Sequence, residues 1–257
     1  MGLSTFIGGV HPYEGKELSS DKPIQVIQPK GELVFPLSQH IGAPAKPLVA
    51  KGDTVLAGQK IAEAGGFISA NVICSVSGTV KGIEPRLMAN GSMVQSIIVE
   101  NDGEYRTVEG FGQKRDYTAL SKQEIRDIVK EAGIVDLGGA GFPTNVKLAP
   151  KNEEEIDYVI VNGAECEPYL TSDYRVMLEQ PEKVVGGLKV ILQLFDKAKG
   201  VIGIEENKPE AIRILSELVK DEPRIQVCTL KTKYQFHHAP GRRRLHRGQH
   251  RHGGIYL

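Results

Sequence analysis

The sequence has 257 residues, of which 40% are hydrophobic, so it can bury one large core or two modest ones. Lysine plus arginine equals aspartate plus glutamate at 32 each, but the last 23 residues carry five arginines and no acid, which leaves about −5 (27 minus 32) on the rest. A mildly acidic body gives no reason to expect a nucleic acid as partner.

The three cysteines, Cys74, Cys166 and Cys228, lie far apart and include no Cys-x-x-Cys pair. They suit a reducing cytosol and cannot by themselves ligate a four-cysteine iron–sulfur cluster. Cys74 and Cys228 are expected to be small buried residues. No stretch approaches about 18 apolar residues and no signal peptide is recognisable at the N-terminus, so we expect a soluble chain that reaches a membrane only through a partner.

Residues 1–30 are predicted to form an extended arm, because glycine and proline recur and few apolar positions are periodic. His11 has no second histidine, cysteine or carboxylate at ligand spacing, so we expect it to be a structural residue.

Residues 31–100 contain short apolar segments separated by turns, a pattern that predicts a small all-β barrel or sandwich. The expected strands cover residues 32–36, 47–50, 54–56, 60–62, 71–73, 78–81 and 96–100. Residues 49–61 and 74–80 resemble biotinyl and lipoyl carrier domains, in which a hairpin presents a lysine for modification. The corresponding residues 63–71 contain no lysine, so we expect a barrel-sandwich packing or docking domain.

Residues 101–116 are predicted to be a linker, and residues 117–234 are predicted to form an α/β domain. Ser121 and Glu124 have the spacing of a capping box at the start of its first helix. Strands and helices then alternate, which implies a parallel sheet with right-handed crossovers and hence a Rossmann-like three-layer fold. The expected strands cover residues 158–161, 200–205 and 224–230, and the expected helices cover residues 182–195 and 208–220.

A glycine-rich segment, residues 136–147, is the first candidate site. Gly138, Gly139 and Gly141 leave main-chain amides accessible to a flat or phosphorylated ligand, and Pro143 with Thr144 suits a helix start that favours an anion. On its own such a segment is more often a tight turn.

A second candidate site follows the strand at residues 158–161, which ends just before Asn162, Glu165 and Glu167. Carboxylates beside a glycine loop suit ribose hydroxyls or a flavin edge, because ligands of open α/β sheets bind at the carboxyl ends of strands. Glu205 and Glu206 follow another strand, where we expect a hydrated strand end.

Several motifs resemble one family. Residues 138–144 (GGAGFPT) and 162–168 (NGAECEP) resemble the flavin and NADH site of the flavoprotein subunit of respiratory complex I. Residues 6–12, 17–23 and 167–175 resemble the C subunit of the Rnf complex, the membrane-bound ferredoxin:NAD+ oxidoreductase that pumps Na+ or H+. The resemblance runs from about residue 5 to Tyr234.

The resemblance implies FMN and NADH as cofactors. Gly138, Gly139, Ala140 and Gly141 would line the flavin, and Asn162 and Glu165 would hydrogen-bond it. Lys147 would approach the flavin phosphate or ring, although a solvated lysine is as good an interpretation. Glu167 would face the nicotinamide nucleotide, and Cys166 is close enough in sequence to contact a cofactor. Asp136 stands where relatives usually have glycine, so its carboxylate could repel phosphate.

The resemblance also implies a peripheral protein on the cytoplasmic face of the bacterial membrane, with other Rnf subunits as partners and ferredoxin reached indirectly. Hydride from NADH would pass to FMN, and single electrons would pass on to 4Fe-4S clusters, for which this chain has no ligands. No catalytic or metal-binding residue is assigned. The alternative is a non-catalytic assembly or docking module of a membrane redox complex.

Residues 235–257 differ in composition from the rest and hold five of the seven histidines. We predict a disordered basic tail, for which metal binding and nucleic-acid binding are the alternatives. A third hypothesis is a shift of reading frame near codon 235, because a one-nucleotide shift could encode a globular acidic segment resembling the family. In that case the chain is truncated and retains part of the cofactor pocket without a competent path for electrons.

Overall fold

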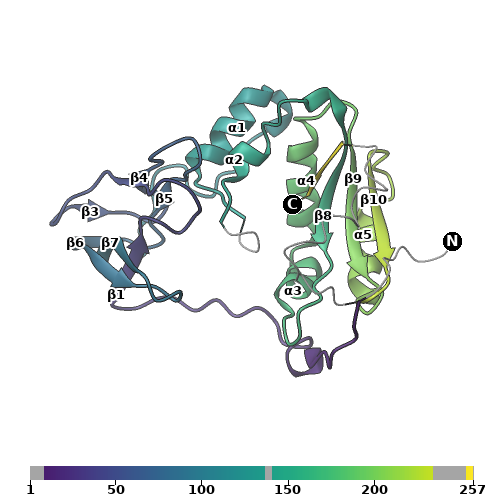
Figure 1. Cartoon of the computed structure of the whole chain (residues 1–257), viewed down its shortest axis with the longest axis horizontal. Coiled ribbons are helices and arrows are strands. Elements are labelled where there is room, and N and C mark those ends of the chain that lie inside the picture. Colours follow the sequence, from purple (N-terminus) through teal and green to yellow (C-terminus); the bar gives the residue numbers. More distant parts are fainter. Residues whose placement is uncertain (1–8, 137–140, 234–252, 257) are drawn as a thin grey trace, which may run out of the picture. The chain divides into compact units, whose positions relative to one another are not determined.

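The computed structural model describes residues 9–136, 141–233 and 253–256. The chain divides into two compact units (Figure 1). The barrel unit is Ile27–Pro150, and the sheet unit combines Met1–Val26 with Lys151–Leu257.

The barrel unit contains two antiparallel sheets, ordered β1-β7-β6-β3 and β2-β4-β5. Their strands are β1 (Glu32–Pro36), β2 (Lys46–Pro47), β3 (Thr54–Val55), β4 (Lys60–Glu63), β5 (Val72–Ile73), β6 (Gly78–Leu87) and β7 (Met93–Asn101). Alternate apolar side chains from both sheets share one core, which includes Phe35, Val55, Ile61, Val76, Val80, Ile97 and Val99. The expected barrel-sandwich fold is therefore confirmed.

Strands β6 and β7 extend beyond the predicted segments, and they pair from Gly78 opposite Asn101 to Leu87 opposite Met93. The outer part of this ribbon is mostly exposed, so its residues show no apolar alternation that a sequence pattern could reveal.

The helices of the barrel unit are the 3-10 turn η2 (Tyr117–Ala119), α1 (Lys122–Glu131) and α2 (Thr144–Lys147). The predicted capping box is present, since the Glu124 amide donates to Ser121 Oγ at 3.2 Å and the Ser121 amide donates to Glu124 Oε2 at 2.8 Å. The α1 helix packs on the β-domain, where Asn71 Nδ2 donates to the carbonyl of Lys130 at 3.1 Å. The boundary between the compact units therefore falls at residue 150, inside the segment 117–234 that was expected to be one domain.

The sheet unit is built on parallel strands in the order β10-β9-β8-β11. Its elements are η1 (Lys16–Leu18), η3 (Glu153–Glu155), β8 (Ile156–Gly163), α3 (Ser172–Glu179), α4 (Pro181–Leu192), β9 (Lys199–Glu205), α5 (Pro209–Leu218), β10 (Ile225–Leu230) and β11 (Gly253–Tyr256). Figure 1 shows α3 and α4 running alongside the strands. Buried Val159, Ile202 and Leu188 form part of the core between strands and helices, as the alternation of elements predicts.

The last four described residues differ from the predicted tail. Gly253–Tyr256 form β11, which pairs in parallel with β8, whereas no regular structure is expected there from the sequence. The remaining residues of the predicted tail, 235–252 and 257, lie outside the described residues, together with the histidines on which the metal-binding alternative depends.

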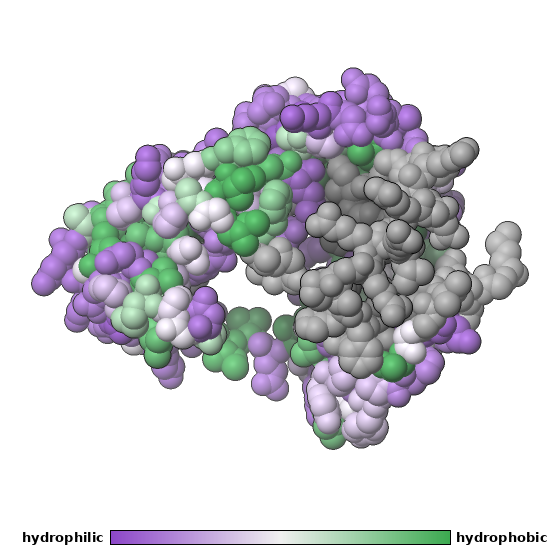
Figure 2. Space-filling view, viewed as in Figure 1, coloured by the Kyte–Doolittle hydropathy of each residue, from purple (hydrophilic) through white to green (hydrophobic). Residues whose placement is uncertain are grey.

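Within the sheet unit, residues 9–26 pack on the segment between β8 and α3. The Tyr169 amide donates to the Glu14 carbonyl at 2.7 Å, and Lys16 Nζ donates to the carbonyls of Glu167 at 2.9 Å and Leu170 at 2.7 Å. Gly15 has a φ of 61°, and a Cβ there would come within 2.4 Å of the Tyr169 ring, so only glycine fits. The segment that follows exposes apolar side chains, among them Val26. Figure 2 shows hydrophobic atoms along the stretch that Figure 1 draws in purple between η1 and β1.

Candidate functional site

The ends of β8 and β9 define the first part of the candidate site. These strands pair in parallel, with Asn162 opposite Gly203 and Gly163 opposite Ile204, so both end at the same edge of the sheet. Glu165 follows β8 and Glu205 ends β9. This is the edge at which open α/β sheets bind their ligands.

Glu165 is buried, with 3% of its surface exposed, and its two carboxylate oxygens have different surroundings. Oε1 accepts hydrogen bonds from the Asp173 amide at 2.8 Å and from Ser172 Oγ at 3.3 Å. Glu165 thus binds the N-terminal end of α3, where amides favour a negative charge. Oε2 is buried and has no hydrogen-bond partner among the described residues. An unpaired buried carboxylate oxygen is costly, so Oε2 is a strong acceptor for a donor supplied by a ligand.

Glu205 is buried, which contradicts the hydrated strand end expected from the sequence. Both Glu205 and Lys208 are 2% exposed, and Lys208 Nζ lies 3.1 Å from Glu205 Oε2. The same ammonium group donates to the Glu165 carbonyl and to Asn207 Oδ1, each at 3.2 Å. Lys208 therefore joins the segment after β8 to the end of β9. Glu206 is exposed, as expected.

Lys208 is a site residue that the sequence patterns did not reveal. Lys208 immediately precedes the first residue of α5, and a cation at a helix N-terminus opposes the helix dipole. That unfavourable position was the available signal that a nearby carboxylate holds the lysine.

Titratable groups are crowded around this edge. Asp173 is exposed, yet the pKa of its carboxyl group is raised by desolvation first and then by the neighbouring charges of Glu165 and Glu167. The pKa of the Cys166 thiol is also raised, by desolvation and then by Glu167 and Glu205. Cys166 therefore remains a thiol near neutral pH, which makes it a weak nucleophile.

Asn162 and Glu167 are exposed at the same edge. Asn162 Oδ1 accepts a hydrogen bond from the Ala164 amide at 3.1 Å, which shapes the turn after β8 and leaves the side-chain NH2 group to act as a donor. The segment carrying Glu167 is held by Lys16 through its main chain, so the Glu167 carboxylate remains accessible. The sheet unit thus brings together Asn162, Glu165 and Glu167.

The glycine-rich segment belongs to the barrel unit, and Gly138, Gly139 and Ala140 lie outside the described residues. Gly141 has a φ of 66°, and a Cβ there would lie 2.8 Å from the Gln39 carbonyl oxygen and 2.9 Å from His40 Cα. Packing therefore requires glycine at residue 141 irrespective of any ligand.

Lys147, at the end of the four-residue helix α2, forms an ion pair with Asp136. Both side chains are partly buried. The pair neutralises the Asp136 carboxylate, whose negative charge was expected to repel phosphate, but it also occupies the Lys147 ammonium group. The predicted site residues therefore form two groups, one in each compact unit.

Metal-binding and membrane-spanning features are both absent from the described part of the chain. Among these residues, no group of three or more histidine, cysteine, aspartate or glutamate side chains is arranged to hold a metal ion. None of the described helices combines the length and apolar character needed to cross a bilayer.

Two family models match the chain. Residues 4–104 match the RnfC barrel sandwich hybrid domain, and residues 129–237 match the Nuo51 FMN-binding domain. The second match includes both the glycine-rich segment and the strand ends that carry Glu165 and Glu205.

Curated relatives agree with these matches. The chain is 44% identical over 232 residues to the C subunit of a proton-translocating ferredoxin:NAD(+) oxidoreductase complex from Clostridium ljungdahlii, covering 90% of this chain and 50% of the relative. It is 44% identical over 233 residues to the C subunit of the Na(+)-translocating complex from Acetobacterium woodii, covering 90% and 52%. The chain thus spans about half the length of the curated relatives that it matches.

Among solved structures, an NAD+-reducing [NiFe]-hydrogenase matches 44% of this chain and 21% of its own chain, at 21% identity and a TM-score of 0.36. This likeness is weak, whereas the family models and the curated relatives agree with each other. The two domain matches, in the order in which the fold contains them, and the relatives at 44% identity show that the chain belongs to the family of C subunits of Rnf-type oxidoreductase complexes.

Proposed function

We propose that this chain is the FMN- and NADH-binding part of an electron-transfer subunit of an ion-translocating ferredoxin:NAD+ oxidoreductase. The observation that carries the proposal is Glu165, a buried carboxylate at the ligand-binding edge of a parallel sheet with one oxygen lacking a partner among the described residues. The match of residues 129–237 to an FMN-binding domain supports the same cofactor.

The residues present suit a flavin nucleotide. The Glu165 Oε2 atom would accept a hydrogen bond from an N–H or hydroxyl group, and Asn162 would donate its amide NH2. In the barrel unit, the amides of Gly138 to Gly141 and the Lys147 ammonium group would bind the phosphate. Glu167 would accept hydrogen bonds from the ribose hydroxyls of NADH.

When bound, FMN would connect the two-electron chemistry of NADH with one-electron transfer. The role of this chain would be to hold both nucleotides and to stabilise charge near them. Beyond the flavin, we propose that electrons pass to 4Fe-4S clusters held outside residues 1–257 and from there through the complex to ferredoxin. Association with the cytoplasmic face of the membrane would depend on other Rnf subunits.

A flavin titration of the purified protein tests the proposal. We expect FMN fluorescence to be quenched at micromolar protein, and Glu165→Gln to weaken binding about ten-fold because a neutral amide is a poorer acceptor. Glu182→Gln, at an exposed position of α4, serves as the control and should bind like the unmodified protein. If the unmodified protein does not bind FMN, a docking module without a cofactor is the better description.

A second set of variants distinguishes binding of the FMN phosphate from binding of the flavin ring. We expect Asp136→Asn to strengthen FMN binding and Lys147→Met to weaken it, because the first variant frees the ammonium group and the second removes it. Riboflavin, which lacks the phosphate, should bind both variants and the unmodified protein equally. Equal effects of these substitutions on riboflavin and FMN would exclude Lys147 as a phosphate contact.

A further inference from the structure

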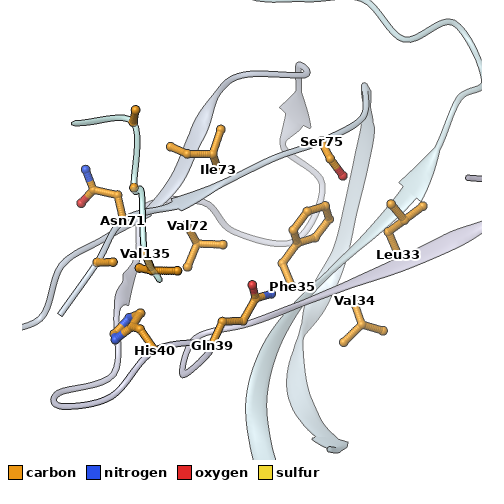
Figure 3. A pocket seen from close by; sticks show the side chains of 13 residues that line it. Leu33, Val34, Phe35, Gln39, His40, Asn71, Val72, Ile73, Ser75 and Val135 are labelled. Carbon is orange, nitrogen blue, oxygen red and sulfur yellow. The ribbon is translucent and has the colours of Figure 1, made fainter. Parts of the chain in front are cut away.

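A cavity of about 440 Å³ lies within the barrel unit. This volume is within the range of ligand pockets, about 300–1,000 Å³. Figure 3 shows His40 and Gln39 at one end, beside Val135, and Leu33 at the opposite end. Phe35 and Val72 lie between them, and Ser75 adds a hydroxyl group on the side of Leu33 and Phe35.

His40 gives its end of the cavity its chemical character. The side chain is buried, with 7% of the residue exposed, and its Nδ1 atom lies 3.0 Å from the Ile41 carbonyl oxygen. A carbonyl oxygen only accepts hydrogen bonds, so Nδ1 must carry the proton. In the neutral ring Nε2 is then an acceptor, and it has no partner among the described residues.

The walls of the cavity are held in place by specific contacts. Asn71 accepts a hydrogen bond from the Ala64 amide at 2.9 Å and donates to the Lys130 carbonyl at 3.1 Å, which ties the β5 side of the cavity to α1. A Cβ at Gly133 would come within 2.4 Å of the Asn71 carbonyl oxygen, so these segments are in direct contact. These contacts hold the β5 side of the cavity against the segment that follows α1.

We propose that this cavity is a second small-molecule site, which takes a planar aromatic compound carrying one hydroxyl or N–H donor. The donor would bind His40 Nε2, and Gln39, which is exposed, would make a second polar contact. The aromatic body would lie against Phe35 and Val72, where water would find few partners. Among the residues that the structure describes, none of those assigned to FMN and NADH lines this cavity, and the site is proposed independently of the proposed function.

The probes are 2-naphthol and 2-methoxynaphthalene, which share the aromatic body and differ in the donor. We expect calorimetric titration of the full chain to give an affinity for 2-naphthol at least about ten-fold higher than for the methyl ether, because only the phenol can donate to Nε2. His40→Phe should remove this preference. His11→Phe, a histidine substitution in the sheet unit, should retain it.

The comparison of the two probes uses the unmodified protein, so it remains informative if His40→Phe fails to fold. Saturating FMN should leave 2-naphthol binding unchanged. Equal affinity for both probes, absence of 2-naphthol binding, or displacement of 2-naphthol by FMN would each overturn the proposal. Failure of FMN to bind, with the preference for 2-naphthol intact, would overturn only the proposed function.

Discussion

Two carboxylates, Asp102 in the barrel unit and Glu165 in the sheet unit, have opposite surroundings. In the barrel unit, Ser77 is fully buried, and its hydroxyl group donates to Asp102 at 2.7 Å and accepts from the Arg106 amide at 2.9 Å. The Ser77 and Arg106 bonds help to lower the pKa of Asp102 to about 2. In the sheet unit, Glu165 keeps an unpaired oxygen and the pKa of Asp173 is raised. The difference shows that the hydrogen bonds around Asp102 are complete, whereas the sheet edge at Glu165 and Asp173 retains an acceptor and charges that a ligand can pair with.

Lys208→Met should cause the largest loss of stability, because it removes the cation of a buried ion pair at the sheet edge. Glu205 would remain buried without its cation, and the loss of one partner of a buried ion pair costs about 3–5 kcal/mol of unfolding free energy. Urea unfolding measures the effect. Lys220→Met is the matched control, because Lys220 also pairs with a glutamate three residues earlier but at an exposed position, where solvent screening leaves little stabilisation to lose. Similar losses in both variants would mean that burial of the Lys208 pair has no energetic consequence.

Ser77→Ala tests the satisfied network of the barrel unit. The substitution removes the donor to Asp102 and the acceptor for the Arg106 amide, and we expect a loss of about 1–3 kcal/mol in urea unfolding. Ser38→Ala, at an exposed position of the same unit, should have little effect.

The dependence of stability on acid pH, measured with the unmodified protein, tests the hydrogen bonds of Asp102 separately. The pKa of Asp102 is lower in the folded protein than its ordinary value of 3.8, so its contribution to stability is complete above that value and is lost as the pH falls toward about 2. Asp102→Asn should remove this part of the acid dependence. An unchanged acid profile in the variant would contradict the assignment.

Asp173→Asn should have the smallest effect, with the opposite sign. Because the pKa of Asp173 is raised in the folded protein, its ionised form disfavours folding, and stability rises as the pH falls through the raised pKa. The variant should therefore melt at a slightly higher temperature at pH 7.5, and the difference should disappear below the ordinary pKa of 3.8. Asp221→Asn, which replaces another exposed aspartate, is the control. A lower melting temperature for Asp173→Asn at pH 7.5 would contradict the prediction.

Local patterns predicted much of the fold. The capping box of α1 depends on residues only three positions apart, and β8 is marked by consecutive apolar side chains, so both could be found from the sequence. Glu165 could be placed at the ligand-binding edge because it follows the end of β8. The burial of Glu205 with Lys208 could not be predicted from the sequence, because it results from the packing of α5 and the segment after β8 against the end of β9. His40 had no local signal at all, since its cavity is formed by segments about thirty and ninety residues further along the chain.

The contact between Gly15 and Tyr169 has a consequence for how the protein can be divided. Because residues 1–26 belong to the sheet unit, the barrel unit is connected to it by two chain crossings, like a domain inserted into another. A fragment that starts at residue 151 would lack both the Glu14 carbonyl that binds the Tyr169 amide and the Lys16 ammonium group that binds two carbonyls of the same segment. Cofactor binding by an excised α/β fragment therefore requires that residues 9–26 be joined to it, as a graft at its N-terminus or as a separate peptide.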